Sequence, residues 1–119
     1  MLRAKDAVGQ YGEDVAARHL QAAGLTIVER NWRCADGEID IVARHGGVLV
    51  FCEVKTRSSV AYGVPAEAVT PVKAARIRRL AGRYLAQRRP PYCELRFDVV
   101  SVVRQPRGAA AVEHLPAAF

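Results

Sequence analysis

The sequence reads GEIDIV at residues 37–42 and, after a short turn, VFCEVK at residues 50–55. Both stretches have the apolar, β-branched content of buried strands, yet Asp40 and Glu53 each place an acid in mid-strand. Lys55 follows two residues after the second acid. Because a buried charge is costly unless it is paired or binds a metal, these three side chains need a physical reason to be there.

The two stretches are predicted to form a hairpin, because His45-Gly46-Gly47 is a turn sequence between them. Residues two apart in a strand point to the same face of a sheet, so Glu53 and Lys55 share a face. Hairpin pairing can bring Asp40 beside them if the register allows. Both faces of the two strands are largely apolar, which is typical of a central sheet covered on each side.

The rest of the chain predicts an α/β fold. We expect helices at residues 5–23 and 66–88, and strands at residues 25–33, 38–44, 48–56, 95–103 and 111–115. The second helix should bury an apolar stripe that includes Val69 and Val72, with Pro71 near its first turn. The expected fold is a mixed central sheet, a three-stranded antiparallel meander plus further strands, flanked by two helices. A length of 119 residues fits a single domain, residues 1–119.

Composition narrows the classes of partner. The net charge of +6 favours anionic partners, with nucleic acid first and an acidic membrane surface second. The three cysteines are scattered and predict neither a disulfide framework nor a zinc site. No apolar run approaches the ~18 residues of a membrane span, and no secretory leader is evident. We therefore expect no membrane partner and a cytoplasmic location.

Two acids on neighbouring strands are suited to phosphodiester cleavage. Two converging carboxylates, Asp40 and Glu53, supply the hard oxygen ligands that Mg²⁺ or Mn²⁺ prefers, and the backbone carbonyl of Val54 can add another. Such a metal polarises a phosphate and lowers the pKa of a bound water. Lys55 can hold or help to deprotonate that water, and it can offset the charge that builds on phosphorus. The alternative is a partly buried ion-pair cluster without metal, although two acids and one base leave it net negative.

Glu13 on the first predicted helix is a further candidate, which could complete the metal shell directly or through water. A helical Glu is normally a solvated surface residue, and on the helix alone that interpretation is favoured. Gly12 beside it costs helix stability relative to Ala. Its presence indicates that some group approaches the helix backbone closely there.

The second helix is strongly basic, with seven positive charges and no acid between Lys73 and Arg89. Four of them, at three- and four-residue spacing, share a stripe that predicts nucleic-acid binding: Lys73, Arg76, Arg79 and Arg83. The alternative is an ordinary solvated helix face, although such a face usually mixes signs. Arg57 and Tyr62, after the lysine of the third strand, are weaker candidates for contact with nucleic acid. Asp98, in the strand at 95–103, is expected to pair with an arginine, and it is the reserve candidate for an acid of the site.

Several motifs together resemble a known family: GED at 12–14, RNWR at 30–33, GEIDIV at 37–42, FCEVKTR at 51–57 and RFDVV at 96–100. Over about residues 9–103 the chain resembles the YraN-like family of uncharacterised bacterial proteins, which is assigned to the restriction-endonuclease-like PD-(D/E)XK fold and is similar to archaeal Holliday junction resolvases. The resemblance implies an α-β-β-β-α-β core. It also implies that Glu13, Asp40, Glu53 and Lys55 are the nuclease positions. Cys52 stands where Val is commoner, a change that a buried face should tolerate.

Three hypotheses of function follow. The first is a Mg²⁺- or Mn²⁺-dependent endonuclease acting on branched or structured DNA, with DNA favoured over RNA. The second is a nucleic-acid-binding module that keeps the fold without turnover, and the third is an interaction protein whose basic face meets an acidic partner. The two-fold symmetry of DNA junctions would suit a homodimer under the first two hypotheses.

Overall fold

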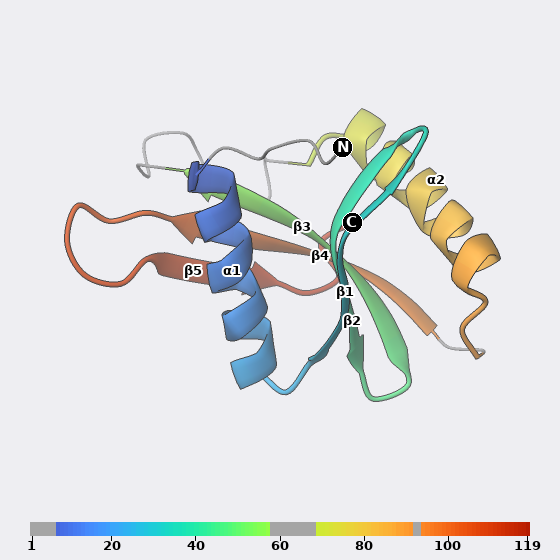
Figure 1. Ribbon diagram of the computed structural model, residues 1–119, viewed down its shortest axis with the longest axis horizontal. Coiled ribbons are helices and arrows are strands. Elements are labelled where there is room, and N and C mark those ends of the chain that lie inside the picture. The colour runs from blue at the N-terminus through green and yellow to red at the C-terminus, as the bar shows by residue number, and fades with distance from the viewer. Residues whose placement is uncertain (1–6, 58–68, 92–93) are drawn as a thin grey trace.

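The computed structural model of the chain describes residues 7–57, 69–91 and 94–119. Two helices and five strands follow one another along the chain (Figure 1). They are α1 (Ala7–Ala22), β1 (Thr26–Cys34), β2 (Gly37–His45), β3 (Val48–Arg57), α2 (Pro71–Arg88), β4 (Glu94–Val103) and β5 (Ala111–Leu115). The predicted α/β class is therefore confirmed, and each expected element is present.

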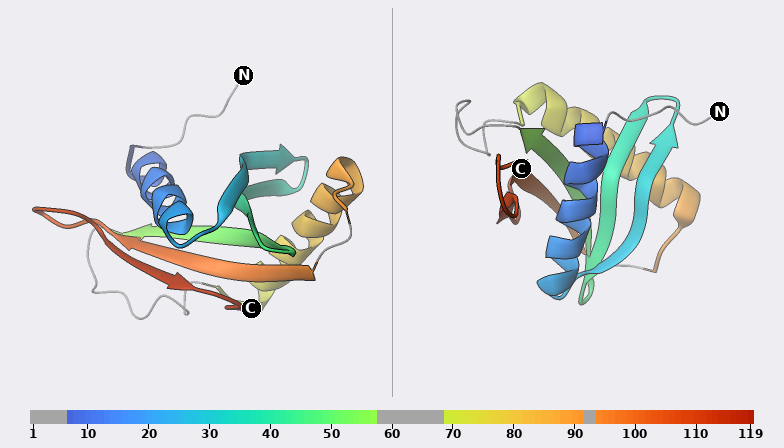
Figure 2. Two further views of the ribbon diagram at one scale, coloured as in Figure 1. Left: turned by 90° about the horizontal axis from the view of Figure 1, so that it is seen from below. Right: turned by 60° about the vertical axis from the view of Figure 1, so that its left-hand side comes forward.

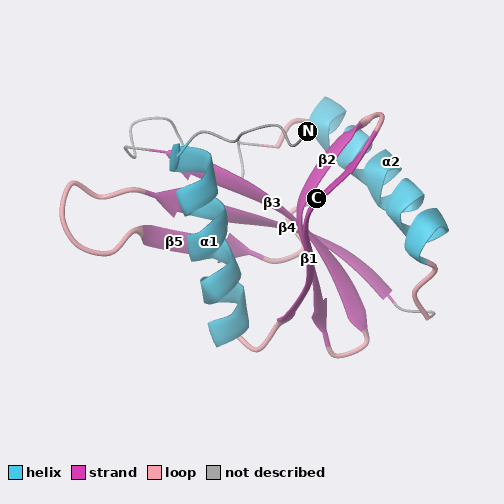
Figure 3. Cartoon of the chain, in the orientation of Figure 1, coloured by secondary structure: helices cyan, strands magenta, loops and turns pink. Residues whose placement is uncertain are grey.

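The strands form one mixed sheet in the order β1-β2-β3-β4-β5. β1, β2 and β3 are the predicted antiparallel meander. β4 pairs with β3 in parallel, and β5 returns antiparallel along β4. Because a parallel pair needs a crossover connection, α2 lies between β3 and β4 in the chain (Figure 3).

The helices pack against two separate apolar clusters, one on each face of the sheet. α1 packs Ala16 and Leu20 against a cluster that includes Ile41, Val50 and Val100. α2 contributes Leu80, Ala81 and Tyr84 to the other cluster. The remaining buried residues of that cluster come from the strands: Trp32, Ile39, Val42, Leu49 and Phe51. The two views of Figure 2 show the helices covering different parts of the sheet. The central strands are thus covered on both sides, as their apolar composition predicts.

α2 begins later than its sequence suggests. Residues 69–70 are not helical, and α2 starts at Pro71, so Val69 lies outside the helix; residues 66–68 of the expected helix lie outside the described residues. Thr70 has extended backbone angles and its hydroxyl accepts a hydrogen bond of 3.1 Å from the Lys73 backbone N–H, which makes it the N-cap. Pro71 is at the first helical position, as expected. Val72 in this first turn is 81% exposed, so its assignment to the apolar stripe is wrong.

β2 and β3 diverge partway along their length. Their paired register runs from His45–Val48 to Ile41–Cys52 and ends there. Beyond that pair, β2 stays with β1 while β3 stays with β4, so the β1–β2 hairpin turns away from β3 (Figures 1 and 2). Asp40 and Glu53 are the first residues of the two separating arms. This fork is the feature of the fold that positions the candidate site.

Candidate active site

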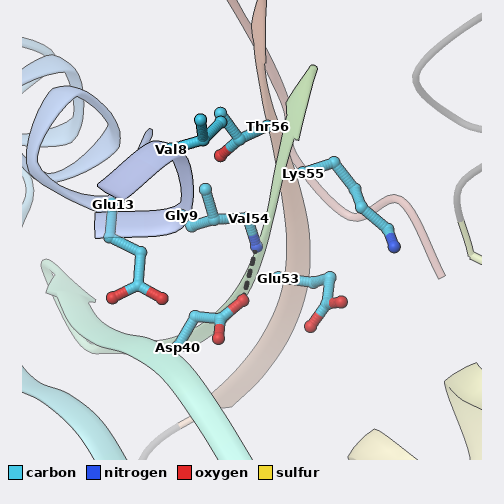
Figure 4. A pocket seen from close by; sticks show the side chains of 8 residues that line it. All are labelled: Val8, Gly9, Glu13, Asp40, Glu53, Val54, Lys55 and Thr56. Carbon is cyan, nitrogen blue, oxygen red and sulfur yellow. Dashed lines mark hydrogen bonds between the residues drawn. The ribbon is translucent and has the colours of Figure 1, made fainter. Parts of the chain in front are cut away.

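A cavity of about 500 Å³ lies at the fork between β2 and β3. Four of the residues that line it are those implied as nuclease positions: Glu13, Asp40, Glu53 and Lys55. Val8, Gly9, Val54 and Thr56 complete the lining (Figure 4). The fold therefore brings together an acid from α1, an acid from β2, and an acid and a base from β3. These charged groups come from α1 and from the two consecutive strands β2 and β3.

Asp40 ties the two arms of the fork together. Its Oδ2 atom accepts a hydrogen bond of 2.9 Å from the backbone N–H of Val54 (Figure 4). The bond holds the β2 carboxylate against β3 where the regular ladder has ended. Because the N–H and C=O of a strand residue point toward the same neighbouring strand, the Val54 carbonyl also faces the β2 side.

Glu13 is buried beside the cavity, with 3% of its surface exposed. A Cβ atom added to Gly12 would lie only 1.8 Å from the Thr56 hydroxyl oxygen. Glycine therefore lets α1 approach β3 closely, which confirms the predicted close approach at this position. Arg30 of β1 reaches across to α1, where its guanidinium lies 3.9 Å from a Glu13 oxygen and 2.8 Å from an Asp14 oxygen. The preference for a solvated Glu13, taken from the helix alone, is thus wrong.

Lys73 joins the site from α2. Its Nζ atom lies 2.6 Å from Glu53 Oε2. Contact with Lys73 is the largest cause that lowers the pKa of Lys55, and partial burial lowers it further. Burial opposes the charged form of Lys73, but hydrogen bonds to Glu53 and Lys55 and the attraction of Glu53 outweigh it and raise the pKa of Lys73. Of these two lysines, Lys73 therefore keeps its positive charge more firmly than Lys55.

Two smaller cavities adjoin the first, because each shares lining residues with its neighbour. The second, of about 180 Å³, also touches Asp40 and Glu53 and is lined on its other side by Lys73 and Arg76. The third, of about 320 Å³, shares Glu38 and Arg76 with the second and reaches the β1–β2 turn. We call the three together the site groove. It leads from the carboxylates, along the first turns of α2, to the end of the hairpin.

The four residues of the predicted basic stripe have different surroundings. Lys73 and Arg76 line the site groove, and the Arg76 guanidinium lies so close to Gly37 that a Cβ there would be 2.9 Å from it. Arg83 is paired with Asp36 of the hairpin turn at 2.7 Å. Arg79 is exposed and does not line any of these three cavities.

The two predicted contact residues of the loop after Lys55 have different outcomes. Arg57 is the last residue of β3 and is partly buried. Tyr62 lies outside the described residues.

The donor chemistry of the fork fits a hard divalent cation. Asp40 and Glu53 offer carboxylate oxygens to one cavity, and Val54 lines the same cavity. Among residues 7–57, 69–91 and 94–119, no group of three or more His, Cys, Asp and Glu side chains is arranged to hold a metal. A metal site here would therefore consist of two carboxylates and the Val54 carbonyl, with Glu13 acting through water.

Asp98 has the structural role expected of it. It is completely buried, and both its oxygens accept hydrogen bonds of 2.9 Å from Arg96. His114 Nε2 lies 2.6 Å from it, and the Ala117 N–H donates to it at 3.0 Å. Burial alone would raise the pKa of Asp98, but these partners outweigh it and lower the pKa. Asp98 thus fastens the C-terminal strand to β4 and is not needed as the reserve acid.

Sequence reasoning missed two contacts of the site. It assigned Lys73 to phosphate contact alone, without its pairing to Glu53, and it gave Arg30 no contact with Glu13. The Thr70-Pro71 pair is a helix-start signal that would have placed Lys73 in the first turn of α2. The reach of Arg30 depends on how α1 packs across β1, which local pattern does not specify.

No helix in the described ranges is both long and apolar enough to cross a membrane.

Comparison with known proteins identifies the family. The model of the uncharacterised protein family UPF0102 matches residues 12–102. A UPF0102 protein of Beutenbergia cavernae is 63% identical over 96% of this chain and 97% of its own length. UPF0102 proteins of Parafrankia sp. (strain EAN1pec) and Frankia alni are 59% and 58% identical, each over 99% of this chain and over 100% and 98% of their own lengths. The chain therefore belongs to the uncharacterised protein family UPF0102, which is the YraN-like family.

Proposed function

We propose that this protein is a metal-dependent endonuclease with a restriction-endonuclease-like fold, which hydrolyses phosphodiester bonds in branched or structured DNA. The observation that carries the proposal is the fork between β2 and β3. There Asp40, Glu53 and Lys55 line one cavity, and Glu13 reaches the same cavity from α1. An inert fold has no evident need for three acids at such a place, because each buried carboxylate is costly.

Each residue of the fork has a role in this proposal. Asp40, Glu53 and the Val54 carbonyl would hold Mg²⁺ or Mn²⁺. When bound, the metal would polarise the scissile phosphate and lower the pKa of a bound water. Lys55 lines the same cavity and donates to the attacking water or to a phosphate oxygen. Glu13 would orient a water bound to that metal. Hydrolysis forms a bond from the water oxygen to phosphorus, with loss of a proton from this water to solvent, and breaks the bond to the leaving sugar oxygen, which takes a proton from solvent water.

The substrate is inferred from charge and from the family resemblance. Lys73 and Arg76 line the site groove beside the carboxylates, and Arg57 ends the strand that carries Lys55. Together they offer positive charge to a phosphate backbone along one side of the cavity. The resemblance to archaeal Holliday junction resolvases favours branched DNA, and the two-fold symmetry of a junction would suit a homodimer.

The test is a cleavage assay. The protein is incubated with Mg²⁺ or Mn²⁺ and a panel of labelled four-way junctions, flaps, duplexes and single strands. Lys55→Ala is the matched variant, because it removes the lysine without touching the proposed metal ligands. We expect wild type to cut at least one substrate and Lys55→Ala to cut far less. Wild-type cleavage no greater than that of Lys55→Ala would overturn the proposal.

One observation favours a second candidate, a DNA-binding module without turnover. Glu53 is already paired with Lys73 at 2.6 Å, as in an ion-pair cluster that needs no metal. This candidate predicts salt-sensitive DNA binding that Asp40→Ala leaves intact and that needs no divalent cation. Binding of that kind, with no cleavage under any of the metal conditions, would favour it over the endonuclease.

A further inference from the structure

Lys73 supplies a positively charged side chain to the site through its ion pair with Glu53. The two side chains are 14% and 29% exposed, so the pair is only partly open to solvent. The described residues that line the cavity at the fork include three acids, Glu13, Asp40 and Glu53, and one lysine, Lys55. These side chains leave an excess of negative charge, which the ammonium of Lys73 reduces at Glu53. Lys73 therefore stabilises Glu53 in the protein without metal.

Glu53 lies in the wall between two cavities. It lines the fork cavity together with Val54 and Lys55, and it also lines the second cavity together with Lys73 and Arg76. Lys73 reaches the carboxylate from the second cavity and does not line the first. The ammonium thus approaches Glu53 from the second cavity, whose lining also includes Asp40 and Arg76.

The backbone of Lys73 is fixed while its ammonium can move. Its N–H is held by the Thr70 hydroxyl at the N-cap, and the next residue, Ala74, is buried against the sheet. The four-carbon side chain carries three donors on a flexible stem. Rotation about the bonds of this side chain can move the ammonium from Glu53 to an anion within the second cavity, and α2 itself need not move.

We propose that Lys73 is an exchangeable counter-cation of Glu53, which neutralises this carboxylate in the metal-free protein and turns to a substrate phosphate once Glu53 binds a divalent cation. The inference rests on the proposed function, since it takes Glu53 as a metal ligand. It assigns Lys73 a positioning role that links metal binding to substrate binding. Lys73 then pairs first with the Glu53 carboxylate and afterwards with a substrate phosphate.

The inference makes a prediction about metal affinity that does not depend on catalysis. Removing a positive charge a few ångströms from a cation site should tighten metal binding, on the order of ten-fold. Mn²⁺ binding is measured by isothermal titration calorimetry on the full chain without DNA. Lys73→Gln should bind Mn²⁺ about ten-fold more tightly than wild type, and Lys73→Arg, which keeps the charge, should resemble wild type.

Two controls make the measurement specific. Arg79→Gln removes one positive charge from the exposed side of the same helix, and its Mn²⁺ affinity should stay within about two-fold of wild type. Glu53→Gln should lose Mn²⁺ binding. Thermal unfolding in EDTA shows whether each variant is folded, and Lys73→Met, which also removes the charge, tests the inference if Lys73→Gln does not fold.

The outcomes separate this inference from the endonuclease proposal. Tighter binding by Lys73→Gln in a protein that cuts no DNA would support the exchange and overturn the endonuclease. Cleavage by wild type with equal Mn²⁺ affinity in Lys73→Gln and Arg79→Gln would overturn the exchange alone. Absence of Mn²⁺ binding in both wild type and Lys73→Gln would overturn the exchange, as would weaker binding in Lys73→Gln.

Discussion

The Asp40 carboxylate accepts a 2.9 Å hydrogen bond from the Val54 backbone N–H, across the point where β2 and β3 separate. The bond replaces a rung of the ladder that the divergence removes, since the regular pairing ends at Ile41–Cys52. Asp40 therefore has two roles in this account. One oxygen fastens the fork, and the carboxylate as a whole offers charge to the cavity.

Asp40→Asn should separate these two roles. An amide oxygen can still accept the Val54 N–H, so the variant should fold with nearly wild-type stability. It lacks the negative charge that a divalent cation needs. Cleavage should fall about a hundred-fold or more, because loss of a metal ligand removes several kcal/mol of transition-state stabilisation.

Urea unfolding and a single-turnover cleavage assay check the Asp40 prediction together. Full activity in a folded Asp40→Asn protein would show that the carboxylate is not a ligand. Asp40→Ala is the comparison variant, because it also removes the acceptor for Val54 and should be less stable than Asp40→Asn.

Gly12→Ala should destabilise the protein and disturb Glu13. The new Cβ would lie 1.8 Å from the Thr56 hydroxyl oxygen, so α1 must move away from β3. Overpacking of this kind costs roughly 1–3 kcal/mol in the free energy of unfolding. The matched control is Gly82→Ala in α2, where nothing lies within 4 Å of the new Cβ. The control should instead gain up to about 1 kcal/mol from helix propensity, and equal effects at the two glycines would contradict the packing argument.

The buried Asp98 should make stability depend on acid pH. Its folded pKa is lowered below the ordinary Asp value of 3.8, so the unfolded chain takes up a proton first as the pH falls. The contribution of Asp98 to stability is therefore complete above about pH 4 and is lost as the pH falls through the lower, folded pKa. Asp98→Asn removes one partner of a buried pair and should cost about 3–5 kcal/mol near pH 7.

Urea unfolding of wild type and Asp98→Asn between pH 2 and 7 measures this contribution. The difference in stability between the two proteins should shrink as the pH falls below about 4. A difference that stays constant down to pH 2 would contradict the lowered pKa. Loss of the Asp98 carboxylate should also release the C-terminal strand β5, because His114 and the Ala117 N–H both bond to Asp98.

The two arginines at 76 and 79 should contribute unequally to DNA binding. Both arginines are exposed, but Arg76 lines the site groove and Arg79 lines none of its three cavities. Arg76→Gln should weaken binding more than Arg79→Gln and should lower the slope of log K against log salt by about one. Fluorescence polarisation with labelled junction DNA over a range of salt concentrations gives both quantities. Equal losses in both variants would favour a diffuse basic face over a defined groove.

Much of the site could be predicted from sequence because it depends on local pattern. Period-two alternation places Glu53 and Lys55 on one face, and an acid-bearing hairpin partner brings Asp40 to them. Gly12 indicated a close approach to α1, which Thr56 makes. Asp98 in an apolar strand indicated a structural pair, and Arg96 provides it.

The remaining features depend on contacts between distant elements. The fork exists because β3 continues along β4 while β2 stays with β1, and no single stretch of sequence encodes that choice. The pairing of Lys73 with Glu53 depends on where α2 begins and how it packs across the sheet. The predicted start at residue 66 missed the Thr70 cap, because apolar periodicity was followed past a helix-start signal.

The central claim is that the fork between β2 and β3 holds a divalent cation. It is tested most directly by diffraction from crystals soaked in Mn²⁺, with anomalous data collected at the manganese absorption edge. The account predicts one anomalous peak about 2.0–2.2 Å from oxygens of Asp40, Glu53 and the Val54 carbonyl, with Lys73 displaced from Glu53. A fork without a manganese peak, in which Lys73 still holds Glu53, would contradict the account.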